Sequence, residues 1–278
     1  MPLVSVVVPT RDRPAALRLC LAALAAQTVL ERLEVVVVDD GSELAVTADY
    51  PFAMVVRFDG RGPAAARNEG ARRARGAILC FTDDDCVPDP DWAEGLAAAI
   101  ERGADAVGGS TIGAGGVLAD ASELVALAPA SAGVPFVPSN NLACTRAAFA
   151  AVPFDEAYPH AAGEDREWCA RLVEAGYVLR VEPSARLIHR QELTLWGFLA
   201  RQVRYGEGAY RFRSRGGGRA ALEPAGFYVG LLRKGFAHGL TVGILVAAAQ
   251  AATALGFIRA SIGRRGGSPT RAARRRPT

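Results

Sequence analysis

The sequence has little of several residues that common protein functions require. Lys234 is the only lysine among 278 residues, and the five cysteines form no CxxC pair. The missing pair argues against a zinc knuckle, and the odd cysteine count argues against a complete disulfide framework, so we expect a reducing cytoplasm. The first residues do not show a charged region followed by a long apolar run, so they are not typical of the signal peptide of a secreted precursor.

Charge is divided unevenly between the two parts of the chain. Residues 1–200 contain 17 Arg and 27 Asp or Glu, a net charge of about −10, whereas residues 201–278 contain 15 Lys or Arg and two Glu, about +13. The acidic part has no platform of basic and aromatic residues for stacking bases, so we expect no nucleic-acid partner. The basic part favours contact with a membrane surface.

Three short apolar runs rich in β-branched residues, 3–8, 33–38 and 77–81, are typical of buried parallel strands. Leucines at helical spacing in 14–26 and an alanine-rich segment that opens with proline, 63–75, predict helices between them. This alternation is typical of βαβ units. The sequence therefore predicts an α/β fold with a mostly parallel central sheet flanked by helices.

Farther along the chain, the patterns predict helices over 91–102 and 163–175 and a strand over 177–181. The glycine-rich stretch 108–116 predicts an irregular connection around a site. Residues 235–258 carry no charged side chain and are long enough to cross a bilayer, but their glycines and alanines lower the hydrophobicity. A span, a helix lying in the membrane plane and a helix packed on the catalytic domain stay open as interpretations.

Three segments follow from these patterns. We expect a catalytic domain over residues 1–210, an apolar and basic helical appendage suited to membrane association over 211–262, and a disordered basic tail over 263–278. This organisation predicts a cytoplasmic protein that lies on the inner face of the cell membrane or is anchored to it.

Polar clusters follow the first two predicted strands. Pro9–Arg13 comes after the first strand, and Val37–Ser42 closes the second. Ligands of open parallel sheets bind at these strand ends, where an acidic residue accepts hydrogen bonds from a ribose or a base. Taken alone, either cluster is equally well explained as a capped turn.

The third cluster places three consecutive carboxylates, Asp83, Asp84 and Asp85, directly after an apolar strand. Their mutual repulsion requires a counter-cation, and carboxylate oxygens suit Mg²⁺ or Mn²⁺, which keep part of their coordination shell for substrate phosphates. The alternative is a solvated acidic loop that stabilises the helix beginning near Asp91. Convergence with the other two strand ends favours the metal site.

Together these segments resemble family 2 glycosyltransferases in their order and approximate spacing, over roughly residues 1–210. The resemblance implies a GT-A fold, a nucleotide-diphospho-sugar donor, Mg²⁺ or Mn²⁺, and inversion at the anomeric carbon. The segments that carry it are Val8–Arg13, Val38–Ser42, Ala66–Gly70 and Thr82–Asp85.

The resemblance also implies roles for individual residues. It places the nucleoside against Thr10, Arg11 and Asp40, the ribose near Asp83, and the base or diphosphate near Arg67. It places the metal on Asp85. The full set implied on the donor side is Pro9, Thr10, Arg11, Asp40, Arg67, Asp83 and Asp84.

Residues 139–144 and 163–168 continue the resemblance. It implies that Asn140 and Asn141 lie in the sugar-binding region, that Glu164 is an acceptor-side carboxylate and that Asp165 is the general base. The residues alone would indicate N-terminal capping of a helix. His189 follows a strand-like segment, and both a structural role and a metal-ligand role for it stay open.

The function implied is an inverting glycosyltransferase that moves a sugar to an acceptor hydroxyl, for an envelope glycan, a glycolipid or a related glycoconjugate. The acceptor could be a glycan, a lipid-linked molecule or a small molecule. One alternative is a sugar nucleotidyltransferase, although Pro9–Arg13 lacks the glycines of its phosphate loop and no lysine follows before Lys234. The other is a membrane-tethered module that binds nucleotide sugars without catalysis, against which the intact carboxylates argue.

Overall fold

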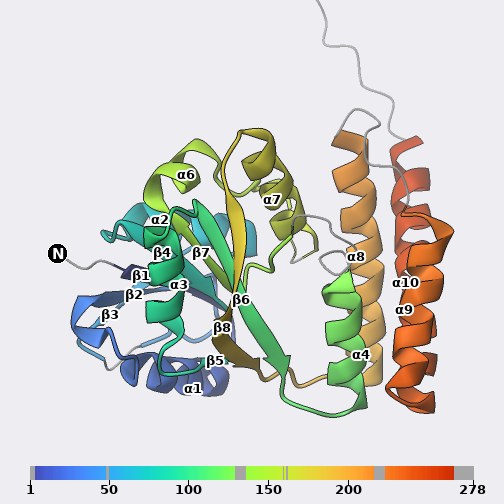
Figure 1. The fold of residues 1–278 in the computed structure, drawn as a ribbon, viewed down its shortest axis with the longest axis horizontal. Helices are drawn as coiled ribbons and strands as arrows, with labels where there is room; N and C mark the ends of the chain where they lie inside the picture. Colours follow the sequence, from blue (N-terminus) through green and yellow to red (C-terminus); the bar gives the residue numbers. More distant parts are fainter. Residues whose placement is uncertain are drawn as a thin grey trace, which may run out of the picture.

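A computed structural model describes residues 4–47, 50–128, 136–158, 160, 162–215 and 223–265. Within them, one mixed sheet of eight strands has the order β3-β2-β1-β4-β7-β6-β8-β5 (Figure 1). The strands are β1 (Val4–Thr10), β2 (Leu33–Asp39), β3 (Ala53–Arg57), β4 (Ile78–Thr82), β5 (Cys86–Pro88), β6 (Ala106–Gly113), β7 (Asn141–Thr145) and β8 (Leu179–His189). The helices are α1 (Pro14–Ala25), α2 (Pro63–Arg73), α3 (Trp92–Glu101), α4 (Val117–Ala126), α6 (Arg146–Ala151), α7 (Glu164–Glu174), α8 (Leu195–Arg215), α9 (Ala225–Ala237) and α10 (Leu240–Arg265).

Strands β3, β2, β1 and β4 form the parallel half of the sheet. Side chains alternate between its faces, so Val6 and Val8 pack in one core cluster with α1 and α3, whereas Val7 packs in another with α2 and α7. Burial on both faces explains the continuous valine runs of β1 and β2. The predicted α/β fold is confirmed, and the three predicted strands and the helices between them agree with the structure to within two residues.

The other half of the sheet is mixed. Strand β7 runs antiparallel to both β4 and β6, and β5 runs antiparallel to β8. The predicted irregular connection over 108–116 is wrong for residues 108–113, which belong to β6, and only residues 114–116 connect β6 to α4. A Cβ atom on Gly109 would lie 2.1 Å from the carbonyl oxygen of Ala185, so this glycine permits close approach within the sheet.

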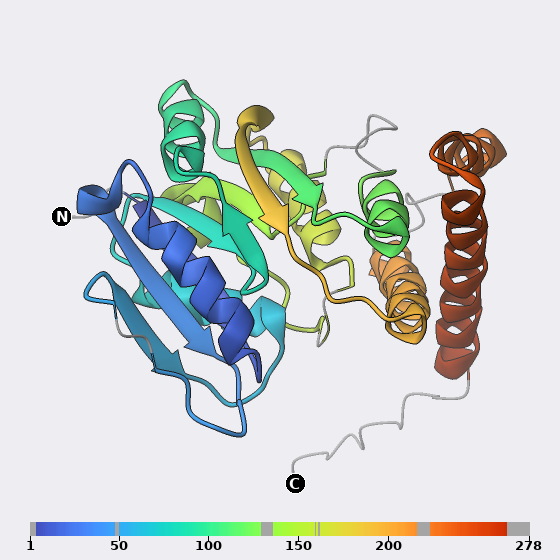
Figure 2. The same cartoon turned by 90° about the horizontal axis from the view of Figure 1, so that it is seen from below.

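Helices α4, α8, α9 and α10 form a layer beside the sheet, with α4 and α8 between the strands and the α9–α10 pair (Figures 1 and 2). Helix α8 crosses α10 at backbone contact. A Cβ on Gly206 would lie 1.9 Å from the carbonyl oxygen of Thr253, and one on Gly256 would lie 1.9 Å from that of Val203. The glycines therefore allow the two helices to meet without intervening side chains.

Helix α10 contains most of the apolar segment 235–258, for which the sequence left open a membrane span, a helix in the membrane plane and a helix packed on the catalytic domain. Its stretch Leu240–Ile262 is long and apolar enough to cross a membrane, and about a third of its most apolar window is buried against the rest of the protein. One face of α10 thus packs on α8 and α9, and the other is exposed. The proposed boundary at residue 210 lies inside α8 and stays a prediction. Most of the predicted disordered tail, residues 266–278, lies outside the described residues.

Candidate active site

The ends of β1 and β4 meet through Thr10 and Asp84. The Thr10 hydroxyl donates to Oδ2 of Asp84 at 2.7 Å, and Nη1 of Arg13 lies 3.2 Å from Asp84 Oδ1 and 3.0 Å from Asp85 Oδ2. Burial raises the pKa of Asp84 to about 6. Arg13 supplies part of the positive charge that the carboxylates require. It lies inside the first sequence motif, but only the fold shows that it faces the third.

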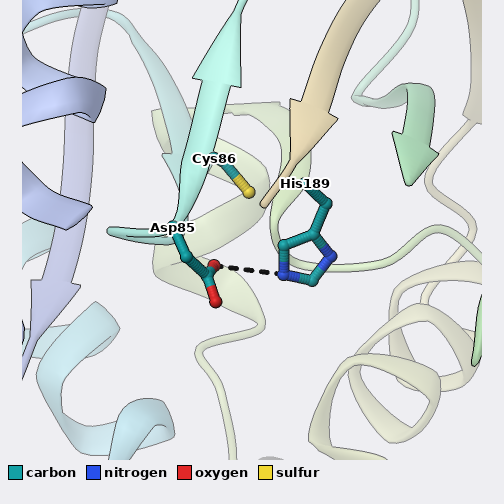
Figure 3. Close-up of side chains that lie close together, drawn as sticks. All are labelled: Asp85, Cys86 and His189. Carbon is teal, nitrogen blue, oxygen red and sulfur yellow. Dashed lines mark ion pairs between the residues drawn. The ribbon is translucent and has the colours of Figure 1, made fainter. Parts of the chain in front are cut away.

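Asp85 precedes β5 and faces His189 at the end of β8, because β5 and β8 pair antiparallel in this register. Oδ1 of Asp85 lies 3.1 Å from Nε2 of His189, and the two side chains point toward one another (Figure 3). This oxygen is buried, and apart from the contact with His189 it has no hydrogen-bond partner. Burial opposes ionisation of Asp85, but His189 and Arg13 outweigh it and hold the pKa below its usual value.

The other ring nitrogen of His189 is also held. Nδ1 lies 3.2 Å from Nδ2 of Asn140, and Nε2 of Gln191 lies 2.9 Å from both ring nitrogens. Gln191 in turn accepts a hydrogen bond from Arg201 at 2.6 Å. Such outer contacts fix the ring orientation that a metal-binding histidine needs.

The Asp85–His189 pair fits a divalent cation. A carboxylate and an imidazole suit Mn²⁺ or Mg²⁺, and the buried oxygen of Asp85 without a hydrogen-bond donor is a ready ligand atom. The thiol of Cys86 lies within 4.8 Å of both groups. Cys86, however, belongs to the apolar core, and burial raises its pKa well above the usual value, so the thiol stays protonated. We therefore count only Asp85 and His189 as candidate ligands.

Arg67 of α2 joins two further carboxylates. Its guanidinium donates to Asp83 at 2.6 Å and to Glu164 at 3.2 Å, and its side chain is 2% exposed. Burial alone would lower the arginine pKa, but the two carboxylates outweigh it and raise the pKa. The guanidinium Nε is buried without a hydrogen-bond partner. Arg67 thus keeps a charged group at the junction of β4 and α7.

Glu164 and Asp165 open α7 directly after Gly163, whose φ of +90° lies in the left-handed region. Glu164 accepts a hydrogen bond from the Ala162 amide at 2.7 Å, and burial together with the Asp165 charge raises its pKa to about 7. Asp165 accepts from the Arg166 and Ser139 amides at 2.8 and 3.4 Å. Burial also raises the pKa of Asp165.

Two residues on the predicted donor side have other partners or remain exposed. The oxygens of Asp40 accept hydrogen bonds from the amides of Arg61 and Gly62, both at 2.9 Å, so Asp40 holds the loop that leads into α2. Arg11 is 58% exposed and contacts Asp12 at 3.6 Å. Pro9 lies in β1 beside them. Their roles toward a nucleoside stay predictions.

The two residues predicted to bind sugar, Asn140 and Asn141, have different surroundings in the structure. Asn141 is fully buried, accepts from Nε1 of Trp92 at 2.8 Å and contacts the carbonyl oxygen of Ala185 at 3.4 Å. It therefore ties the sheet to α3 and β8. Asn140 instead lines a pocket, and its Oδ1 has no hydrogen-bond partner.

This pocket has a volume of about 670 Å³, large enough for a sugar and part of its carrier. It continues from the carboxylates to side chains of α4, α8, α9 and α10. The predicted residues on its wall are Arg67, Asp83, Asn140, Glu164, Asp165 and His189. Those outside it are Pro9, Thr10, Arg11, Asp40, Asp84, Asp85 and Asn141.

Residues 5–124 match the family model described as Glycosyl transferase family 2. The pre-mycofactocin glycosyltransferase of Mycobacterium tuberculosis is 32% identical to this chain over 227 residues, which cover 74% of the chain and 46% of that protein. The chain therefore spans about half the length of this curated relative.

Two solved structures are similar to the whole chain. Mannosyltransferase PcManGT from Pyrobaculum calidifontis, in complex with GDP-Man and Mn²⁺, has a TM-score of 0.61 at 21% identity, covering 96% of this chain and 76% of that one. TarS of S. aureus, residues 1–349, has a TM-score of 0.54 at 17% identity, covering 97% and 93%. At these identities the likeness shows the fold alone, and it confirms the predicted GT-A fold.

Proposed function

Since the chain belongs to glycosyl transferase family 2 and has a GT-A fold, we propose that it transfers a sugar from a nucleotide-diphospho-sugar to an acceptor hydroxyl, with inversion at the anomeric carbon. One observation carries this proposal: Asp83, Asp165 and His189 come from distant parts of the chain and line one pocket. Carboxylate and imidazole groups within one cavity are needed to bind an acceptor hydroxyl, a donor sugar and its diphosphate together.

A divalent cation is part of the proposal. The PcManGT structure contains Mn²⁺ and GDP-Man, and the Asp85–His189 pair fits such an ion. When bound, the cation would neutralise charge on the departing diphosphate. Arg13 already stands beside Asp84 and Asp85, and Arg67 beside Asp83, so the chain itself places two guanidinium groups near the carboxylates.

Asp165 is the proposed base. Its carboxylate would take the proton of the acceptor hydroxyl while that oxygen attacks the anomeric carbon from the face opposite the nucleotide, which produces inversion. The two backbone hydrogen bonds to Asp165 fix its direction. Glu164, with a pKa of about 7, carries a proton for part of the time at neutral pH and so limits the negative charge beside Asp165.

Contact with the inner face of a membrane is the second part of the proposal. Exposed apolar side chains form a stripe at helical spacing along α10, and basic residues such as Arg233, Lys234 and Arg259 stand near its ends. An apolar stripe flanked by cations is typical of a helix that lies at an anionic lipid surface. The stripe residues are Leu240, Ile244, Leu255, Ile258 and Ile262. This placement suits synthesis of an envelope glycan or glycolipid.

A thermal-shift screen tests the donor and the metal together. Nucleoside diphosphates and their sugars are added with and without Mn²⁺ to the wild type, to Asp85→Ala and to a control, Asp91→Ala, whose exposed side chain makes no capping hydrogen bond. We expect a Mn²⁺-dependent rise in melting temperature with one nucleotide, lost only in Asp85→Ala. No shift with any nucleotide would contradict the proposal.

The same proteins separate the alternatives. Release of sugar 1-phosphate when pyrophosphate is added to a bound nucleotide sugar would indicate a sugar nucleotidyltransferase. Metal-dependent donor binding without donor hydrolysis or transfer to any acceptor would indicate a binding module. Nucleoside diphosphate formation that depends on an added acceptor supports the glycosyltransferase.

A further inference from the structure

Part of the pocket forms a compartment beyond the carboxylates, where the lining residues belong to helices rather than to the sheet. Its wall residues recur at helical spacing on α8 and again on α10, so each helix presents one face to the same space. We call this compartment the helical chamber and define it by Val125 of α4, Gln202 and Phe212 of α8, Leu231 of α9, and Ala254 and Phe257 of α10. Most of these side chains are apolar.

Gln202 is the exception in this wall. It is 0% exposed, and neither the amide nitrogen nor the amide oxygen has a hydrogen-bond partner. A buried amide without partners is unfavourable unless a bound molecule supplies them. Thr111 and Asn140 line the same pocket, and Thr111 Oγ1 and Asn140 Oδ1 are also buried without a partner. An occupant with several hydroxyl or other hydrogen-bonding groups would supply partners for these three side chains.

The chamber reaches the C-terminal part of the apolar stripe of α10. Ile258 lines the pocket and is 54% exposed, and Ala254, one turn earlier, is also both exposed and on the pocket wall. Phe257 lines the pocket between them and packs edge-on against Tyr210 with ring centroids 5.3 Å apart. The apolar wall of the chamber therefore continues to the outer face of α10 at Ala254 and Ile258, beside the guanidinium of Arg213, which also lines the pocket.

Resting on the proposed function, we propose that the helical chamber binds the acceptor, and that the acceptor is a lipid with a hydroxyl-bearing head group. The head group lies between Gln202 and Asp165, and the hydrocarbon chain lies along α8 and α10 and leaves toward the bilayer at Ala254 and Ile258. In the transfer, the acceptor oxygen bonds to the anomeric carbon, the bond from that carbon to the diphosphate breaks, and the acceptor proton passes to the Asp165 carboxylate. The nucleoside diphosphate is the leaving group.

Photolabelling tests where an alkyl chain binds, without any knowledge of the natural acceptor. The probe is an octyl-length β-D-glucoside with a diazirine at the chain end, used below its micelle concentration, and labelled peptides are identified by mass spectrometry. We expect labels on chamber residues, with excess octyl β-D-glucoside competing at least tenfold better than methyl β-D-glucoside. Labels confined to the outer stripe, or equal competition by both glucosides, would overturn the proposal.

Two substitutions on one helix sharpen this test. Ala254→Phe fills the opening of the chamber, whereas Ala251→Phe adds the same ring to an exposed position of α10 outside the pocket. Ala254→Phe should reduce chamber labelling at least fivefold, and Ala251→Phe should leave it unchanged. Equal effects would mean that the probe binds the outer surface.

Gln202→Leu tests the polar contact. It removes a buried amide without partners, so the folded protein should be as stable as the wild type or more so, while chamber labelling falls at least fivefold. Unchanged labelling would remove Gln202 from the acceptor site. The Mn²⁺-dependent rise in melting temperature with nucleotides separates failure of the acceptor proposal from failure of the proposed function. If this rise is preserved but no chamber residue is labelled, the acceptor proposal alone is wrong. If the rise is missing, the proposed glycosyltransferase function is wrong.

Discussion

Arg67 of α2 donates a hydrogen bond to Glu164 at the start of α7, although the two residues lie 97 positions apart in the chain. Both side chains are almost fully buried, at 2% and 3% exposure. The same guanidinium holds Asp83 at the end of β4. One arginine therefore links Asp83, which is proposed to lie on the donor side, to the pair of acidic residues that contains the proposed base.

The raised pKa of Glu164 predicts a stability change with pH. Its folded pKa of about 7 lies above the ordinary value of 4.5, so its contribution to stability is fully present below pH 4.5 and is lost as the pH rises through 7. Glu164→Gln removes this dependence. We expect the free energy of unfolding of the variant, relative to that of the wild type, to be higher at pH 8 than at pH 5 by on the order of 1–3 kcal/mol, as measured by urea unfolding. A pH-independent difference would contradict the raised pKa.

Asp165→Asn should abolish transfer while donor binding survives. The amide keeps the shape of the side chain, and its one oxygen can still accept the shorter hydrogen bond, from the Arg166 amide. Its NH₂ group cannot accept from the Ser139 amide, and the side chain cannot take the acceptor proton. We expect the transfer rate to fall by roughly 10²–10⁴-fold, with an unchanged nucleotide-dependent thermal shift. Asp91→Asn serves as the matched control. Full turnover in Asp165→Asn would show that another group is the base.

Of the three histidines in the chain, we expect only His189 to contribute to metal affinity. Titration of Mn²⁺ against melting temperature, with saturating nucleotide, should give an apparent affinity on the order of tenfold weaker or more in His189→Ala. His238→Ala is the control, because this imidazole is exposed at the end of α9, where its Nδ1 lies 2.9 Å from the Lys234 carbonyl oxygen. Equal affinities in both variants would assign His189 a structural role.

The sequence revealed the strand ends because short apolar runs and the charges after them are local patterns. It could not separate Asn140 from Asn141, since their partners, His189 and Trp92, come from distant segments. Asn140 lies in the turn before β7 and lines the pocket, whereas Asn141 is the first residue of β7 and enters the core. The role of Arg13 and the strand through Gly109 depended in the same way on contacts that only the fold creates.

Gly206 shows how the helical layer depends on a missing side chain. Gly206→Ala would bring a methyl group against the Thr253 carbonyl and force α8 and α10 apart, at a cost of about 1–3 kcal/mol of unfolding free energy. Gly230→Ala in α9 is the matched control, because its Cβ would meet nothing within 4 Å. That control should be neutral or more stable by about 0.5–1 kcal/mol. Urea unfolding followed by circular dichroism measures both.

The exposed face of α10 predicts binding to anionic vesicles. In the wild type, Ile244 and Leu255 are 56% and 59% exposed, so glutamates there should leave the fold intact and oppose both insertion and attraction to the lipid. Co-sedimentation with phosphatidylglycerol-containing vesicles should fall at least tenfold in the Ile244→Glu/Leu255→Glu variant. Leu44→Glu, at an 85% exposed leucine far from α10 in the sequence, should bind as the wild type does. High salt should weaken wild-type binding, because charges beyond a Debye length are screened. Equal sedimentation of the three proteins would instead mean that the stripe packs against protein, and lipid contact would have to come from elsewhere.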